Sequence, residues 1–330
     1  MTTPTAPLAL ALLSLDGVGR VSAHRLLERF PTVDALRATP REQVLLRLKG
    51  APHAEQTVAT LFDADAFRPA LDRAEAEVAA LRGKQIHVLA PGGAQPGAPQ
   101  TDGPGGAGWL GRPLGGWPAG LDDVPRSDRP VVLYAYGETD ALRRPALAVL
   151  ARAPLDGPAF EAAQGIVRRL ATPPGTEAPA LVVGAQSGVD LALQKVALDA
   201  GVPVVVVVEA GLARLRPNMR PGATAVVRAG GVLVSPFPMT HGPYDHDDRE
   251  RALVQAALGT AVCAVAPPAD SPEDRAAAWA AEAGRPLALV PPAGLRSAGL
   301  RSAPPGASWA EGALVVDGPA AVETVAGWFG

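Results

Sequence analysis

The second half of the chain alternates short, uninterrupted apolar runs with segments of helical periodicity, and this pattern restricts the fold more than any other feature. The apolar runs are VVLYAY (131–136), ALAVLA (146–151), ALVVG (180–184), VVVVV (204–208), GVLVS (231–235), AVCAVA (261–266) and LALV (287–290). A strand that is apolar at every position is buried on both faces, which favours a parallel sheet covered by helices. Helices are expected at 157–171, 190–200, 247–258, 272–283 and 319–329. The sequence therefore predicts an α/β fold with a doubly wound, mostly parallel sheet, whose ligands bind at the carboxyl ends of the strands.

Composition divides the chain into three parts. Residues 1–80 are rich in Leu, Ala and charged residues, with apolar positions such as Leu12, Leu26 and Phe30 at helical spacings, and they predict a small all-helical domain. Residues 81–129 include the Gly/Pro-rich stretch PGGAQPGAPQTDGPGGAGWLGRPLGGWPAG, which cannot bury enough surface to offset its chain entropy. We interpret 81–129 as a linker and entry segment, and 130–330 as a Rossmann-like domain.

The overall charge excludes a polycation. Lys and Arg number 30 against 33 Asp and Glu, a formal net charge of -3, so any nucleic-acid site must be a local patch. The single cysteine, Cys263, permits no intramolecular disulfide and lies in an apolar run, which indicates a small buried hydrophobe. The apolar N-terminal stretch lacks the flanks of a signal peptide, and no run approaches the length of a membrane span. We expect a soluble cytoplasmic protein with no membrane partner.

The strongest local signal in the second half is LVVGAQSGVDLALQ, where an apolar strand turns through Gly184, Ser187 and Gly188 into a helix. Backbone amides at such a turn, together with the roughly half positive charge at a helix N-terminus, attract phosphate. The dinucleotide-binding pattern GxGxxG is not satisfied. The two glycines could instead only permit a tight turn, and Asp190 could be the N-cap of the helix. On the residues alone, phosphate binding and this structural role both stay open.

Two other segments place arginines and glycines near a helix start. In YDHDDRERALVQAAL, Arg249 and Arg251 point to different faces, so one can reach a phosphate while the other pairs within the protein. The aspartates before them favour an internally paired, exposed charge cluster. In SLDGVGRVSAHRLLERF, Gly17 and Gly19 precede a helix as in a helix-hairpin-helix element, where their amides would form a secondary DNA contact to which Arg20 and Arg25 add charge. Without a second copy, a packing role is favoured for this hairpin.

The sequence offers no constellation for catalysis or metal binding. The five histidines are scattered, no Cys pair exists, and HExxH, GxSxG and Walker motifs are absent. We therefore predict no catalytic residues, no metal and no cofactor. Aromatic residues make up 4% of the chain, which leaves few platforms for base stacking, so single-strand binding would depend mostly on phosphates.

Taken in order, these segments resemble the DNA-processing protein A (DprA, or Smf) family over nearly the whole chain. SLDGVGRVSAHRLLERF resembles its N-terminal hairpin, GWPAGLDDVPRSDRPVVLYAYGE its Tyr-Pro entry and Leu-Tyr-x-x-Gly strand, and GAQSGVD its Gly-x-x-x-Gly-Ile-Asp motif. EAGLARLRP looks like the family's Gly-Leu-Asp-x-x-Tyr-Pro segment, and GGVLVSPFP looks like its Gly-x-Leu-Leu-Ser-Glu-Tyr-Pro segment. DRERALVQAAL resembles the family's Arg-Asn-Arg helix, and GRPLALVPP and EGALVV resemble its last strand and tail. The resemblance implies a protein that binds single-stranded DNA, loads the RecA recombinase during natural transformation, and forms a homodimer through the α/β domain.

The resemblance also implies which residues hold DNA phosphates, and several positions depart from it. The implied residues are Arg152, Gly184, Ser187, Gly188, Arg249 and Arg251, with Lys195 as a neighbour. The family's Gly-Ser-Arg turn is here Leu150, Ala151 and Arg152, and the Asn between the two helix arginines is Glu250. At 267–275, PPADSPEDR replaces the family's phosphate loop.

These departures indicate a diverged member. The leading hypothesis is a DprA-like single-stranded-DNA-binding recombination mediator that is not an enzyme. One alternative is a nucleotide-binding enzyme related to the cytokinin-activating phosphoribohydrolases. The other is a degenerate, non-binding DprA paralogue.

Overall fold

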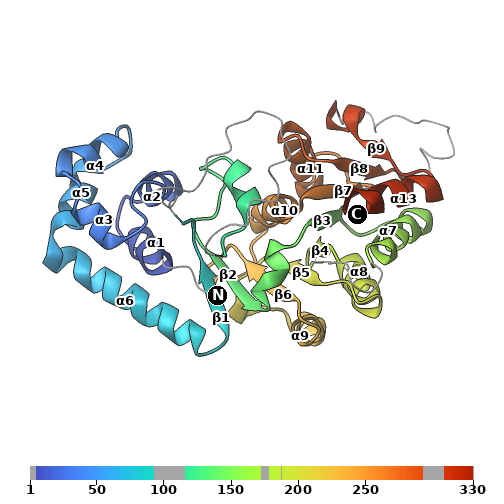
Figure 1. Cartoon of the computed structure of the whole chain (residues 1–330), viewed down its shortest axis with the longest axis horizontal. Helices are drawn as coiled ribbons and strands as arrows, with labels where there is room; N and C mark the ends of the chain where they lie inside the picture. Colours follow the sequence, from blue (N-terminus) through green and yellow to red (C-terminus); the bar gives the residue numbers. More distant parts are fainter. Residues whose placement is uncertain (1–4, 93–115, 172–177, 187, 293–307, 330) are drawn as a thin grey trace. The chain divides into compact units, whose positions relative to one another are not determined.

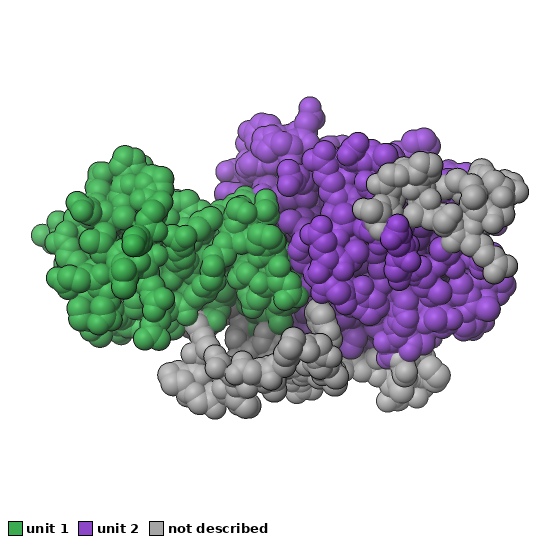
Figure 2. All heavy atoms as spheres, turned by 90° about the horizontal axis from the view of Figure 1, so that it is seen from above, with its two compact units in different colours: residues 1–135 green, residues 136–330 purple. Residues whose placement is uncertain are grey.

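The chain forms two compact units, Met1–Ala135 and Tyr136–Gly330 (Figure 2). The computed structural model describes residues 5–92, 116–171, 178–186, 188–292 and 308–329. Most of the Gly/Pro-rich stretch predicted as a linker therefore lies outside the described residues. The division falls after Ala135, whereas the sequence places the start of the α/β domain at residue 130.

The first unit is helical as far as residue 82. Its helices are α1 (Ala6–Leu13), α2 (Arg20–Leu27), α3 (Val33–Arg37), α4 (Arg41–Arg47), α5 (Ala54–Phe62) and α6 (Ala64–Arg82). Two starts have the capping residue expected of them: the Thr32 side chain accepts a hydrogen bond from the amide of Ala35, and Asp63 accepts from those of Asp65 and Ala66. Apolar side chains of these helices, including Leu12, Leu26, Leu27, Leu61 and Phe67, are buried together as the core.

A short strand, β1 (Ile86–Leu89), and a 3-10 helix, η1 (Ala119–Asp123), follow in the segment interpreted as linker. The sequence pattern did not indicate β1, because four apolar-rich residues between Gly83 and Pro91 are too few to show a period. The next strand, β2 (Leu133–Gly137), crosses the division between the units.

The second unit is built on a parallel sheet. Its strands β3 (Ala146–Ala151), β4 (Ala180–Val183), β5 (Val204–Val207), β6 (Val232–Ser235), β7 (Ala261–Val265), β8 (Leu287–Val290) and β9 (Leu314–Val315) lie in the order β6-β5-β4-β3-β7-β8-β9. All neighbouring pairs in this order are parallel, with Val149 opposite Cys263 at the centre. The chain proceeds from β3 to β6 on one side and returns beside β3 with β7. The topological switch point, where open α/β sheets bind ligands, is therefore between β3 and β7.

Helices cover both faces of this sheet (Figure 1). On one face lie α7 (Gly157–Arg169), α8 (Gly188–Asp199), α9 (Arg220–Arg228) and α13 (Pro319–Ala326), and on the other α10 (Asp247–Leu258) and α11 (Pro272–Glu282). Strands β3 to β8 are buried at every position, which is why their sequences are apolar throughout. Cys263 is fully buried, and burial raises the pKa of its thiol to about 12. The predicted fold class is confirmed.

One α-helix and one β-strand of this unit have no counterpart in the prediction. The segment RPGATAVVR forms α9 because Pro221 occupies the first turn, where a missing amide hydrogen costs nothing, although Pro and Gly together suggest a loop. Strand β9 contains only two residues. Among the described helices, none is both long and apolar enough to cross a bilayer.

Candidate nucleic-acid interface

The carboxyl ends of the parallel strands bring together three residues predicted to bind phosphate: Arg152, Gly184 and Arg251. Arg152 follows β3, Gly184 follows β4, and Arg251 lies near the start of α10. A Cβ atom on Gly184 would be 2.8 Å from Nη1 of Arg251 and 3.1 Å from Oδ2 of Asp190. The glycine therefore leaves room for the Arg251 guanidinium and the Asp190 carboxylate beside the backbone.

Side chains of α8 form hydrogen bonds with two backbone groups of the turn after β4. Oδ2 of Asp190 accepts a hydrogen bond from the amide of Gln186 at 3.0 Å, and Nε2 of Gln194 donates to the carbonyl of Gly184 at 2.9 Å. Asp190 lies within α8, not at its N-cap. Gly188 is exposed, and a Cβ there would meet no atom within 4 Å. Ser187 lies outside the described residues.

Arg152 and Arg251 share one buried carboxylate, that of Glu273 on α11. Nη2 of Arg251 lies 2.5 Å from Oε1 of Glu273, and Nε of Arg152 lies 2.7 Å from Oε2. Nη2 of Arg152 also pairs with Oδ2 of Asp248 at 2.9 Å. The side chains of Arg251 and Glu273 are 2% and 1% exposed, and that of Arg152 is 30% exposed. We name Arg152, Asp248, Arg251 and Glu273 the Glu273 cluster.

The Glu273 cluster lies at the carboxyl ends of β3 and β7, which flank the switch point, and it carries no formal net charge. Burial alone would lower the pKa of Arg152, but its bonds to Glu273 and Asp248 raise it. Gln255 completes the cluster by accepting from Arg251 and donating to the carbonyl of Val149 at 2.7 Å. The positive charge that the sequence suggests for phosphate binding is therefore offset within the protein. Phosphate binding by Arg152, Gly184 and Arg251 stays a prediction.

The remaining predicted cations are exposed. Nζ of Lys195 lies 2.8 Å from Oδ2 of Asp199, one turn further along α8. Arg249 is exposed near the start of α10, and within the described part of the chain it forms no ion pair. Of the two helix arginines, Arg251 is thus internal and Arg249 faces solvent, as expected for residues two apart.

The predicted secondary DNA contact lies between α1 and α2. Gly17 has a φ of +79°, and a Cβ there would lie 3.2 Å from Cβ of His53. Gly19 is the N-cap of α2 with extended backbone and open space around it, and Arg20 is the first residue of the helix. Gly17 is thus explained by its backbone conformation and by packing, while DNA contact by these residues is untested.

A group of exposed arginines that the sequence reasoning missed follows β5. Arg214, Arg216 and Arg220 are exposed in the segment that contains the 3-10 helices η3 (Leu212–Arg214) and η4 (Pro217–Met219) and the start of α9. The charge composition of the segment could have revealed this group, since residues 210–244 contain four arginines and no Asp or Glu. In a chain of net charge -3, such a segment is a local source of positive potential.

An aromatic ladder follows β6 at the same edge of the sheet. The rings of Phe237 and His241 stack with centroids 4.8 Å apart, His241 meets Tyr244 edge-on at 5.0 Å, and Tyr244 stacks on His246 at 5.7 Å. Tyr244 is 55% exposed, and the side chain of His246 is 81% exposed. Low aromatic content argued against stacking platforms, but four of the chain's few rings fall within FPMTHGPYDH.

Hydrogen bonds join the ladder to the arginine segment and to α10. The amide of Gly211 donates to the carbonyl of His241 at 2.9 Å, and Nε of Arg214 donates to the carbonyl of Thr240 at 3.3 Å. Oδ2 of Asp247 lies 2.9 Å from Nε2 of His241 and accepts from the amide of Tyr244. These hydrogen bonds connect Arg214 and the backbone of the ring-bearing loop to each other and to α10.

One carboxylate lies beneath the arginine segment. Glu209 follows β5, is 6% exposed, and pairs through Oε1 with Nη2 of Arg216 at 2.7 Å. Its Oε2 has no hydrogen-bond partner within the described part of the chain. Burial raises the pKa of Glu209, while Arg216 and Arg251 oppose that rise. Arg216 is thus partly neutralised, whereas Arg214, Arg220 and Arg249 lack an ion pair with any residue that the structure describes.

The described residues include no group of three or more His, Cys, Asp or Glu side chains that could hold a metal ion. The acidic side chains near the switch point are instead bound to arginines or to backbone amides.

Two solved structures share this fold. DNA processing protein A from Streptococcus pneumoniae matches with a TM-score of 0.65 at 16% identity, covering 98% of this chain and 98% of that one. DNA processing protein A from Helicobacter pylori, whose structure is described in terms of its single-stranded DNA binding mode, matches with a TM-score of 0.50 at 18% identity, covering 64% of this chain and 92% of that one. No curated protein matches the sequence.

The family assignment comes from a sequence match that lies mostly in the second unit. The model for DNA recombination-mediator protein A matches residues 114–308, which is more than half of the chain and includes the Glu273 cluster, the arginine segment and the aromatic ladder. The shared fold agrees with this match over 98% of the chain. On this evidence the chain belongs to the DNA recombination-mediator protein A (DprA) family.

Proposed function

We propose that this protein binds single-stranded DNA through the carboxyl edge of its sheet. The surface comprises four arginines and two exposed rings, which we name the arginine–aromatic edge: Arg214, Arg216, Arg220, Tyr244, His246 and Arg249. The observation that carries the proposal is that exposed guanidinium groups and an exposed aromatic stack lie on hydrogen-bonded neighbouring loops.

Each component matches one part of an unpaired strand. Guanidinium groups bind phosphate oxygens through paired N–H donors. Aromatic side chains stack on bases and contribute roughly 1–3 kcal/mol per base, without strong sequence preference. A duplex hides its base faces, so the exposed Tyr244–His246 stack favours a single strand. The DNA-binding mode described for the Helicobacter pylori relative supports the same ligand class.

The proposal gives the residues predicted from sequence different roles. Arg249 remains a DNA contact, because it is exposed and near the ladder in sequence. Arg152 and Arg251 hold Asp248 and Glu273, and thereby fix α10 and α11 at the ends of β3 and β7. Arg152 retains 30% side-chain exposure, so a phosphate reaching it would have to compete with two carboxylates.

The family implies a wider role, which we include in the proposal. Bound strands would be handed to the RecA recombinase during DNA processing and natural transformation, without catalytic turnover, by a cytoplasmic homodimer that joins through the α/β domain. Loading is tested by RecA nucleation on single-stranded DNA coated with a single-strand-binding protein. A measured mass equal to that of one chain would contradict the homodimer.

A second candidate is a non-binding paralogue, and the Glu273 cluster specifically favours it. Two carboxylates neutralise the guanidinium groups nearest the switch point. Asp245 and Glu250 add further negative charge close to Arg249 in sequence. If these charges dominate, the edge repels a phosphodiester.

Fluorescence anisotropy with a labelled oligo-dT strand separates the two candidates. At low salt the wild-type chain is expected to bind, and the Arg214→Ala and Arg220→Ala double variant to lose most of that binding. Arg228→Ala is the control for the loss of one arginine, because Arg228 is exposed in the same acid-free segment but lies at the far end of α9. No binding by the wild type at low salt would establish the second candidate. Equal losses in the Arg228 variant would contradict the placement of the site.

A further inference from the structure

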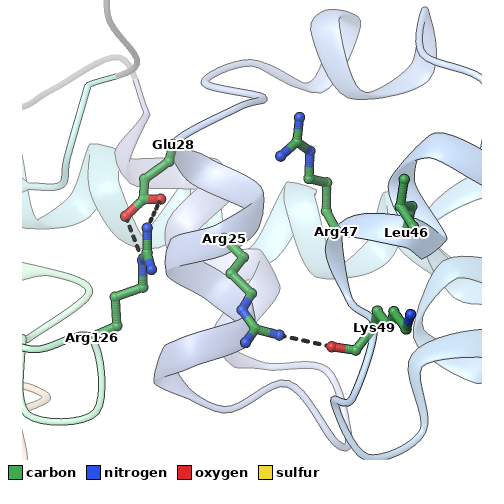
Figure 3. Close-up of a pocket in the computed structure, with 6 residues that line it drawn as sticks. All are labelled: Arg25, Glu28, Leu46, Arg47, Lys49 and Arg126. Carbon is green, nitrogen blue, oxygen red and sulfur yellow. Dashed lines mark hydrogen bonds and ion pairs between the residues drawn. The ribbon is translucent and has the colours of Figure 1, made fainter.

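The first unit contains a basic cavity that the proposed function does not use. It has a volume of about 310 Å³ and is lined by Arg25, Glu28, Leu46, Arg47, Lys49 and Arg126 (Figure 3). The lining comprises four cations and one carboxylate, a formal net charge of +3. We name it the N-terminal cavity.

The one carboxylate of the cavity is fully engaged. Oε1 and Oε2 of Glu28 accept from Nε and Nη2 of Arg126 at 2.9 and 2.7 Å, a bidentate pair that is visible in Figure 3. Arg129 lies 3.8 Å from the same carboxylate. The hydrogen bond to Arg126 lowers the pKa of Glu28, so this carboxylate stays ionised and committed to its arginines. The charge of the other three cations is therefore not offset by Glu28.

Those cations come from α2 and from the end of α4 with the turn that follows it. Arg25 lies on α2, and its Nη1 donates to the carbonyl of Lys49 at 3.1 Å (Figure 3). This bond fixes the guanidinium while using one of its five donors. Arg47 is the last residue of α4, and Lys49 follows it; both are exposed, and neither pairs with a carboxylate of the described residues. The cavity thus presents three cations, one of them anchored, to any anion that enters.

The surrounding sequence favours a polymeric anion over a single small one. Residues 20–50 contain seven Arg or Lys and three Asp or Glu, a net charge of +4 in a chain whose total is -3. Arg29, Arg37 and Arg41 are exposed within this stretch but lie outside the cavity lining. A free phosphate would need only the cavity, whereas successive phosphodiesters would use the exposed cations beyond it.

We propose that the N-terminal cavity binds a backbone phosphate of a nucleic acid, and so forms a second DNA site in the first unit. The proposal shares with the proposed function only the class of ligand. It involves different residues in a different compact unit, so either site can exist without the other.

Photocrosslinking locates the two sites separately. The full chain is irradiated with an oligonucleotide that contains 4-thiothymidine, and crosslinked peptides are identified by mass spectrometry. Crosslinks within residues 20–50 support the cavity, and crosslinks within residues 209–250 support the arginine–aromatic edge. Crosslinks confined to 209–250 would overturn the cavity proposal and leave the proposed function intact, and the reverse pattern would overturn the proposed function alone.

Two matched double variants test the charge argument. Arg47→Gln with Lys49→Gln is expected to remove the 20–50 crosslinks and to reduce the magnitude of the salt slope of binding by about 0.7 for each phosphate lost. The control, Arg82→Gln with Lys84→Gln, removes the same charge from exposed positions at the end of α6 and is expected to change neither. Equal effects in both pairs would overturn the proposal. Inorganic phosphate, added at constant ionic strength, is expected not to displace the oligonucleotide; binding of phosphate without crosslinking of DNA would also overturn it.

Discussion

The Glu273 cluster predicts a large stability loss from a substitution that barely changes shape, Glu273→Gln. Glutamine keeps the size of the side chain but removes the negative charge shared by Arg152 and Arg251. Arg152 is 30% exposed and keeps its ion pair with Asp248, so the substitution destabilises Arg152 only slightly. Arg251 is 2% exposed, and among the described residues its remaining side-chain hydrogen-bond partner would be the neutral Gln255.

Removing one partner of a buried ion pair costs about 3–5 kcal/mol, because the other charge is left buried without compensation. We expect a loss of about 3 kcal/mol for Glu273→Gln, at the lower end, since the glutamine oxygen can still accept a hydrogen bond. With a denaturant slope of about 2 kcal/mol per molar urea, the midpoint would fall by about 1.5 M.

Urea unfolding followed by tryptophan fluorescence measures this loss, because Trp279 lies on the same helix as Glu273. The control is Glu282→Gln, which removes an exposed carboxylate from that helix and should change stability by less than about 0.5 kcal/mol. If Glu273→Gln cost no more than the control, the cluster would not hold the helices, and Arg152 and Arg251 would again be candidates for phosphate binding.

Three further predictions concern other residues. Burial lowers the pKa of His24 from 6.5 to about 4, so its neutral ring contributes stability that is present above pH 6.5 and is lost as pH falls towards 4, by about 3 kcal/mol; urea unfolding at several pH values should show this fall in the wild type and a flatter profile in His24→Gln. Glu209→Gln should release Arg216 and make the salt slope of oligo-dT binding steeper by about 0.7, and an unchanged slope would show that Arg216 does not contact phosphate. Gly211→Ala should cost about 1–3 kcal/mol by thermal or urea unfolding, because its Cβ would lie 2.1 Å from the carbonyl oxygen of Pro238, whereas Gly312→Ala, with open space around the site, should cost much less.

Much of the fold could be predicted because the buried strands of the sheet are apolar at every position. Strands such as Val204–Val207 are covered on both faces, so each position must be apolar and the run is visible without an alignment. Helices α10 and α11 start and end within about a residue of their predicted positions. Strand β1 escaped prediction because it is four residues long, and α9 because Pro221 and Gly222 mark loops as often as helix starts.

The candidate site was less predictable, since local sequence does not show which charges pair. Glu273 lies 121 residues from Arg152 in the sequence, yet it binds that guanidinium, and only the sheet topology brings the two together. Tyr244 and His246 look like parts of a polar loop until their rings are seen to stack. The absence of acidic residues from 210–244 was visible in the sequence and would have indicated the arginine segment.

The salt dependence of oligo-dT binding tests the central claim most directly. If Arg214, Arg220 and Arg249 each neutralise one phosphate, the arginine–aromatic edge contributes about -2 to the slope of log K against log salt. Tyr244→Ala should then weaken binding about fivefold to 150-fold through lost base stacking, with the slope unchanged. A wild-type chain that fails to bind oligo-dT at low salt, or a Tyr244→Ala variant that binds as tightly as the wild type, would contradict the account.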